Sequence, residues 1–197
     1  AKQWEQDFLY PETGVTVAGF DLGTAKLGHG IAVYPYIDFP LSKTGHWHFR
    51  YGLGLGYIET IFDKDVNYKE VAIGSHINGV IHFDLHYEIA LNKSAALLFN
   101  AGLTHFSNGS MNMPNLGINL AHINAGFKKE FGTVTLNRKP TGEKISRSPF
   151  IAIMVMGGMK KVYPQFGPQY YAATISGLRL VPLRKKSFWG YGADLFF

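Results

Sequence analysis

The chain contains no cysteine, and its 197 residues include no hydrophobic run of the roughly 18 to 20 residues that a membrane-spanning helix requires. Without cysteine, neither a disulfide framework nor a thiolate metal site can form. A secretory signal is missing at Ala1, which leaves a mature exported chain and a cytosolic chain both open. The chain is instead rich in glycine (23 residues) and aromatic side chains (15%), a composition that favours a single β-rich domain.

Long stretches of the chain alternate between apolar and polar side chains, as β-strands do when only one face is apolar. Between His76 and Glu88, the odd positions are mostly aliphatic or aromatic, and the even positions carry mostly histidine, asparagine and carboxylates. In segment 46–57 the odd positions are again apolar or aromatic and the even ones are histidine, arginine or glycine, and in segment 187–197 the odd positions are apolar or aromatic from Trp189 onward. The alternation continues over roughly 10 to 12 residues, the length of a tilted strand that crosses a membrane.

Nine strands are expected after a polar lead-in at residues 1–14, and residues 15–197 are expected to form one barrel domain. The expected strands are roughly 15–22, 30–40, 46–58, 76–90, 95–107, 117–131, 150–159, 170–182 and 187–197. Short connections at Leu41–Gly45 and Asn92–Ser94 alternate with long ones at Glu59–Ser75 and Asn108–Leu116. Short turns of outer-membrane barrels face the periplasm, so the long loops are predicted to face the cell exterior.

The strand count and one connection depart from the usual barrel pattern. Gly132–Pro149 is long for a periplasmic turn. A complete bacterial barrel has an even number of strands and both termini in the periplasm, whereas the ninth expected strand ends on the exterior side. We therefore expect an all-β, antiparallel transmembrane β-barrel of eight or more strands. Either the chain continues past Phe197, for a total of about 10 to 12 strands, or one strand is miscounted.

Two environments could surround the apolar face. In a soluble lipocalin-like barrel this face points inward, whereas in an outer-membrane barrel it meets lipid and the polar face lines a packed interior. The lysines favour the membrane, because all of them fall in expected turns, loops or strand ends. Aromatic residues also gather toward strand ends, as in an interfacial girdle. These aromatic residues are Tyr34, Tyr36, Trp47, Tyr57, Tyr170, Tyr171 and Trp189.

A histidine and a serine continue the apolar face of the expected strand 95–107. If the following hairpin turns near Met111–Met113, Ser107 pairs with Asn119, and His105 pairs with Ala121. A neutral imidazole can take the proton of a serine hydroxyl during attack on an ester carbonyl, and we expect the two groups to approach within about 3.5 Å. The alternative to a catalytic pair is that both residues belong to a belt of polar side chains where the strands leave the membrane.

The sequence His105-Phe106-Ser107-Asn108-Gly109, followed by Pro114-Asn115-Leu116-Gly117-Ile118-Asn119, resembles the signature of the lipid A 3-O-deacylase (PagL), or acyloxyacyl hydrolase-like, outer-membrane barrel family. Esterases of this family have an active site that opens on the lipid-facing outside of the barrel. The resemblance implies that His105 is the general base and Ser107 the nucleophile. Asn108 and Asn115 match conserved asparagines, and Asn115 is the better candidate for oxyanion stabilisation.

Asn119 departs from the family pattern, because it takes the place of the acidic triad member. An asparagine can orient the imidazole, but it cannot stabilise an imidazolium as a carboxylate does. The resemblance implies a serine esterase of the bacterial outer membrane that hydrolyses an ester-linked acyl chain of lipid A or lipopolysaccharide among outer-membrane lipids. No cofactor is expected for such acyl transfer. Because Asn119 replaces the acidic residue, an alternative is that the barrel is catalytically silent. It would then serve as a structural or lipopolysaccharide-binding subunit of an outer-membrane assembly.

Other polar patterns point to weaker possibilities. A second polar row lies on the expected interior face and consists of His82, Asp84, His86 and Glu88. These residues could ligate a metal. Because polar side chains inside small barrels usually satisfy one another by hydrogen bonds and ion pairs, no metal is predicted. The net charge of +5 and dibasic pairs such as Lys160-Lys161 suit either lipid phosphates or strand-end anchoring. No combination of aromatic and basic residues indicates binding of nucleic acid.

Overall fold

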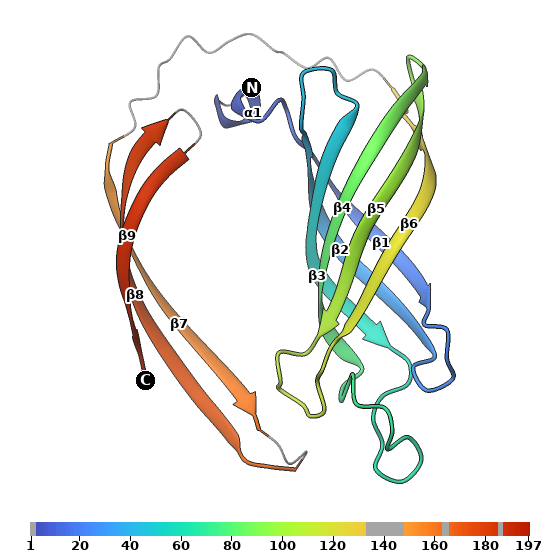
Figure 1. Cartoon of the computed structure of the whole chain (residues 1–197), viewed down its shortest axis with the longest axis vertical. Helices are drawn as coiled ribbons and strands as arrows, with labels where there is room; N and C mark the ends of the chain where they lie inside the picture. The colour runs from blue at the N-terminus through green and yellow to red at the C-terminus, as the bar shows by residue number, and fades with distance from the viewer. Residues whose placement is uncertain (1–2, 133–147, 163–165, 185–186) are drawn as a thin grey trace.

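A computed structural model describes residues 3–132, 148–162, 166–184 and 187–197; most of the connection Gly132–Pro149 lies outside them. The described chain contains one short helix, α1 (Gln3–Asp7), and nine strands (Figure 1). The strands are β1 (Glu12–Asp21), β2 (His29–Pro40), β3 (Trp47–Ile58), β4 (Ile77–Asn92), β5 (Ala95–Ser107), β6 (Ile118–Lys129), β7 (Phe150–Lys161), β8 (Gln169–Arg184) and β9 (Ser187–Phe196). Each corresponds to an expected strand, although α1 and the start of β1 fall within the predicted lead-in.

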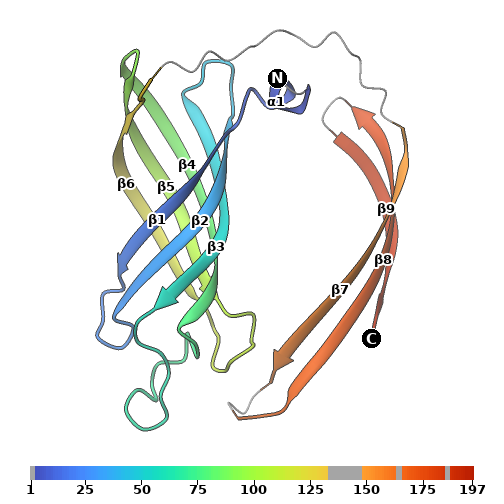
Figure 2. The ribbon, with the colours of Figure 1, turned by 180° about the vertical axis from the view of Figure 1, so that it is seen from behind.

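The strands form two antiparallel sheets. Strands β1 to β6 pair in chain order in a six-stranded sheet, and β7, β8 and β9 form a second sheet. The sheets curve toward each other as two arcs (Figures 1 and 2). The Lys161 N–H, at the end of β7, donates to the Ser110 carbonyl 2.7 Å away, in the loop after β5. This all-β antiparallel architecture confirms the predicted fold class.

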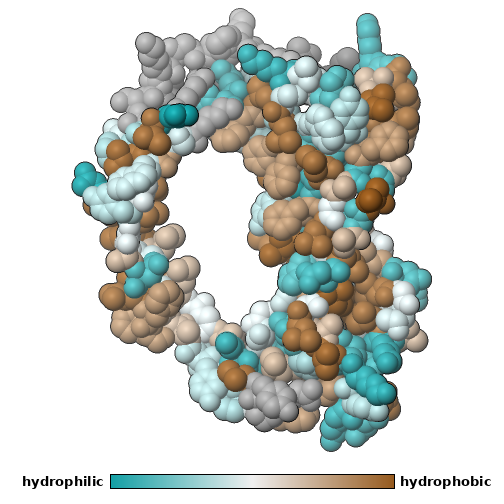
Figure 3. Space-filling model, viewed as in Figure 1, coloured by the Kyte–Doolittle hydropathy of each residue, from teal (hydrophilic) through white to brown (hydrophobic). Residues whose placement is uncertain are grey.

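No helix in the described ranges is long and apolar enough to cross a membrane. The six-stranded sheet has an apolar outer face and a polar inner face over much of its length. On β4, Phe83 and Leu85 are 39% and 42% exposed, whereas His82, Asp84 and His86 are buried. Figure 3 shows hydrophobic residues over much of both arcs, with hydrophilic residues at the lower loops and also near the upper end. This inside-out distribution agrees with the prediction that the apolar face meets lipid.

A small hydrophobic core fills the concave side of the six-stranded sheet near the lower loops in Figure 1. Its fully buried members include Ile58, Val80 and Phe106, which come from three neighbouring strands. The Phe20 ring meets the Phe106 ring edge-on, with centroids 5.5 Å apart. This core fixes the lower ends of β5 and β6 from inside, so the residues that alternate with its members are turned outward.

The outward face provides a direct test of the membrane environment. Phe99→Arg should lower the free energy of unfolding by about 2 to 4 kcal/mol, because the guanidinium would lose hydration inside the hydrocarbon layer. Tyr68→Arg is the matched control, since both aromatic side chains are exposed, at 49% for Phe99 and 60% for Tyr68, but Tyr68 lies in the loop between β3 and β4. Denaturant unfolding in phospholipid vesicles measures both changes, and equal losses would contradict a lipid-facing strand surface.

Candidate active site

The end of β5 and the start of β6 place His105, Ser107 and Asn119 on the face opposite the core. Phe106 pairs with Ile118 and both point into the core, while His105 pairs with Asn119. The predicted register, with Ser107 opposite Asn119 and His105 opposite Ala121, was therefore wrong by two residues. A shift of two residues keeps every side chain on its face, so the alternation could not detect it.

His105 is held by the residue across the strand pair. Its Nδ1 lies 2.7 Å from Oδ1 of Asn119. Because an amide oxygen only accepts hydrogen bonds, this contact keeps the proton on Nδ1 and leaves the Nε2 lone pair available. Gly117 allows the close packing: its φ is +80°, and a Cβ at this position would lie 2.7 Å from Cε1 of His105. Only glycine meets both requirements without strain.

The Ser107 hydroxyl is surrounded by N–H donors from the loop between β5 and β6. The Asn115 side-chain amide donates to Ser107 Oγ at 2.9 Å, and the Gly109 backbone N–H donates to the same atom at 3.2 Å. The Asn108 backbone N–H donates to Oδ1 of Asn115 at 3.1 Å, which fixes the direction of that amide. Two donors therefore converge on the Ser107 hydroxyl oxygen and fix its position, and the same N–H groups lie next to where the carbonyl oxygen of an attacked ester would be.

His105 and Ser107 are adjacent on one face, but no hydrogen bond joins them within the described part of the chain. Neighbours two residues apart on a strand are separated by roughly 6.5 to 7 Å at the backbone, so their side chains must turn to meet. Here each side chain is held by an asparagine instead. The approach within about 3.5 Å stays a prediction for the substrate complex, since catalytic hydrogen bonds often tighten only there.

Asn108 and Asn115 have different surroundings. The Asn108 side chain is buried, and its Nδ2 donates to Ser75 Oγ at 2.7 Å and to the Asn112 carbonyl at 3.1 Å. Asn108 therefore holds the loop together and orients Asn115 through its backbone. Of the two asparagines, only Asn115 directs its amide at Ser107.

The long loop between β3 and β4 supports the site from the side. The buried Glu70 carboxylate accepts hydrogen bonds from the Ala72 and Ile73 N–H groups, at 2.6 and 3.1 Å. Burial raises the pKa of the Glu70 carboxyl, and the backbone N–H groups lower it to a smaller extent. The Ala72 carbonyl in turn accepts from the Gly117 N–H at 2.9 Å. The loop thus positions the glycine that packs on His105.

Several supporting residues were not assigned a role from the sequence. Gly109 and Gly117 lie inside the motif that suggested the site, and their glycine identity was the available signal. Ser75 lies in the loop between β3 and β4, outside that motif, where a single serine gives no local signal. For Glu70, no local pattern distinguishes a buried carboxylate from an ordinary loop residue, because its partners are backbone groups.

Comparison with known proteins identifies the family of this chain. No curated protein and no solved structure matches the chain. The family model of lipid A 3-O-deacylase (PagL) matches residues 1–128, which contain α1, the His105–Asn119 site and nearly all of the six-stranded sheet. Because this match covers more than half of the 197 residues, the chain belongs to the lipid A 3-O-deacylase (PagL) family of outer-membrane hydrolases.

Proposed function

We propose that this protein is a serine esterase of the bacterial outer membrane that hydrolyses an ester-linked acyl chain of lipid A. The observation that carries the proposal is the Ser107 hydroxyl, which lies beside His105 and receives two N–H donors on the apolar outward face. Phe99 and Leu103, farther along the same face of β5, are exposed. An acyl chain lying on these side chains would bring its ester to the end of the strand.

The reaction follows from the hydrogen-bonding roles of the site. His105 Nε2 takes the Ser107 hydroxyl proton as Oγ attacks the ester carbonyl, and the oxyanion forms beside the Asn115 amide and the Gly109 N–H. When the tetrahedral intermediate collapses, the ester C–O bond breaks and His105 gives its proton to the leaving sugar alkoxide. Water then attacks the acyl-enzyme, again deprotonated by His105, and releases the fatty acid and free Ser107.

Asn119 supports the orientation of His105 but contributes no charge. Its Oδ1 accepts the Nδ1 proton and keeps Nε2 directed as a base. An imidazolium formed during the attack would gain less stabilisation from this neutral amide than from a carboxylate. We therefore expect an active esterase in which the formation of the imidazolium limits the rate.

Lys161 supplies a cation at the same end of the molecule. Its Nζ lies 3.4 Å from Oδ1 of Asn112, in the loop that carries Asn115, and its side chain is therefore close to the candidate site. A lysine at this position suits the phosphate groups that flank the acylated sugars of lipid A. Lipid A and lipopolysaccharide are the partners that this combination of apolar face, N–H donors and cation favours.

The serine and histidine can be tested directly. Ser107→Ala and His105→Ala should each abolish deacylation of lipid A, measured by mass spectrometry of lipid A incubated with the purified protein. The double variant should be no worse than either single one, because the two groups act as one unit. Ser42→Ala, in the turn between β2 and β3, is the control and should retain full activity. Heat-modifiable gel mobility checks that each barrel is folded.

Two outcomes would count against this assignment. Activity in Ser107→Ala close to that of the wild type would remove the serine from the mechanism. A folded wild-type barrel in lipid without any deacylase activity would favour the alternative of a structural or lipopolysaccharide-binding subunit.

Asn119 allows a finer test of the base. Asn119→Asp or Asn119→Glu should raise the rate, by up to about 100-fold or ~2.7 kcal/mol of activation free energy, because a carboxylate would stabilise the imidazolium. Single-turnover hydrolysis of a lipid A ester measures the change. An unchanged rate would show that imidazolium formation is not limiting.

The two asparagines of the loop should differ in their effects. Asn115→Ala should lower kcat by about 100- to 1000-fold with little change in KM, since it removes a donor to the oxyanion. Asn108→Ala should instead destabilise the loop, seen as faster proteolysis between residues 108 and 117, because it frees Ser75 and the Asn112 carbonyl. Similar kcat losses without any change in proteolysis would contradict this division of roles.

A further inference from the structure

The polar row on the inner face of β4 divides between two different clusters. His86 lies near Asp38 and His48, from β2 and β3, whereas His82 and Asp84 lie near His122, from β6. Each cluster brings two imidazoles and one carboxylate together, with one possible ligand atom from each residue within 4.8 Å of the others. The hydrogen bonds that these residues already make distinguish the two clusters.

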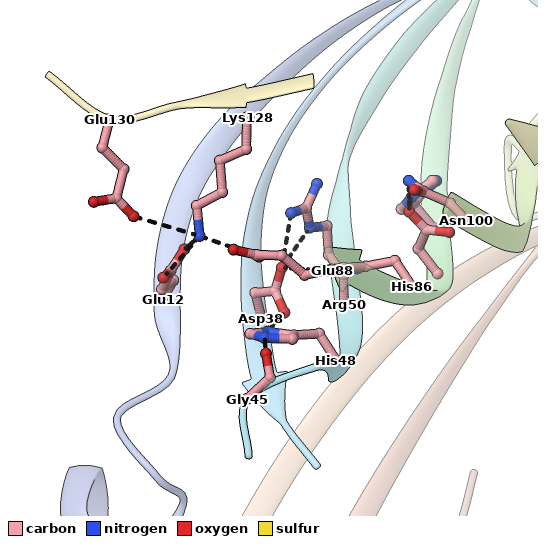
Figure 4. A network of polar contacts seen from close by, with 12 residues as sticks. Glu12, Asp38, Gly45, His48, Arg50, His86, Glu88, Asn100, Lys128 and Glu130 are labelled. Carbon is pink, nitrogen blue, oxygen red and sulfur yellow. Dashed lines mark hydrogen bonds and ion pairs between the residues drawn. The ribbon is translucent and has the colours of Figure 1, made fainter. Parts of the chain in front are cut away.

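The Asp38 cluster is an ion-pair network whose ligand atoms are largely occupied (Figure 4). Arg50 donates twice to Oδ2 of Asp38, through Nε at 3.0 Å and a terminal nitrogen at 2.7 Å. His48 contacts Oδ1 of Asp38 through Nδ1 and the Gly45 carbonyl through Nε2, each at 3.0 Å. With both ring nitrogens donating, His48 has no lone pair for a metal, which leaves His86 as the one imidazole of this cluster that could bind an ion.

The second cluster leaves its ligand atoms available. Nε2 of His82 lies 3.8 Å from Oδ2 of Asp84, and Nε2 of His122 lies 3.7 Å from Oδ1, both too long for hydrogen bonds. Oδ1 of Asp84 is buried and has no hydrogen-bond partner in the described structure. The two histidine nitrogens thus approach different oxygens of one carboxylate, and its buried Oδ1 lacks a hydrogen-bond donor or a cation.

Neighbouring residues orient these ligands. Nδ1 of His82 lies 2.9 Å from the Thr104 hydroxyl, and a hydrogen bond donated by Nδ1 directs the Nε2 lone pair at the cluster. Asn100 donates to Oδ2 of Asp84 at 2.9 Å. Gly102 makes room, because a Cβ there would lie 2.7 Å from Nε2 of His122 and 3.0 Å from Oδ1 of Asp84.

We propose that His82, Asp84 and His122 bind a divalent transition-metal ion of the zinc type inside the barrel. Bonds of about 2.0 to 2.2 Å in a tetrahedral site place neighbouring ligand atoms about 3.4 Å apart. The ligand atoms of the three residues lie within 4.8 Å of one another, and the two histidines approach different oxygens of Asp84, at 3.8 and 3.7 Å, so a small shift of the side chains completes the site. Two imidazoles and a carboxylate suit zinc, and a water molecule completes the tetrahedron. The ion joins β4 to β6 across β5, so it stabilises the sheet apart from the Ser107 site.

Zinc binding tests this site without reference to activity. The protein is refolded in detergent without a histidine tag, stripped with a chelator, and titrated calorimetrically with zinc chloride. The wild type should bind a single ion, and His122→Gln should weaken the affinity tenfold or more, since even loss of a supporting residue typically costs about 10- to 100-fold. His122 is the chosen position because its side chain is 22% exposed and makes no hydrogen bond in the described structure, so the variant should fold.

His86→Gln is the matched control, because it changes the neighbouring inward histidine of β4, and its zinc affinity should equal that of the wild type. Heat-modifiable gel mobility confirms folding of all three proteins. Cobalt(II) substituted for zinc should give the strong visible absorption of a tetrahedral site in the wild type and in His86→Gln only. Zinc should also raise the unfolding temperature of these two proteins. No zinc binding by the folded wild type, or equal affinity in His122→Gln, would overturn the proposal.

Discussion

Burial of Phe106 is the contact on which the candidate site depends. The ring lies wholly inside the core with Ile58 and Val80, and it pairs across the strands with Ile118. Because neighbours on a strand point to opposite faces, this single inward position turns His105 and Ser107 outward together. The same pairing places Asn119 opposite His105, so the core determines both the orientation and the register of the site.

The inner and outer faces of the six-stranded sheet meet different environments. The outer face of the six-stranded sheet is apolar and exposed, which suits lipid, so polar and charged side chains must be satisfied inside. Asp38 meets this requirement through Arg50 and His48, and Lys128 meets it through Glu12 and Glu88 (Figure 4). Four buried polar atoms lack a partner in the described structure, and Oδ1 of Asp84 is the one carboxylate oxygen among them, which supports the proposed ion.

The candidate site relies on amides more than on charges. Asn115 and Asn119 hold the serine and the histidine, and Asn108 orients Asn115 through its backbone. Amides fix direction by donating on one side and accepting on the other, so they preorganise the site at the surface of the barrel without placing a charge beside lipid. Glu70 and Ser75 support the loop that carries these amides through hydrogen bonds from the β3–β4 connection.

The sequence by itself determined the strands and the shared face of His105 and Ser107, because these depend only on a period of two residues. The outward direction of the apolar face was predicted separately, from the positions of the lysines and the aromatic residues. Tertiary structure alone decided the pairing of His105 with Asn119, since a shift of two residues leaves the alternation unchanged. It also decided the partners of Asp84. His122 lies far along the chain from Asp84, and the two residues meet because β6 follows β5 in the sheet. Contacts between strands that are not neighbours depend on the register and curvature of the sheet, which no local sequence pattern encodes.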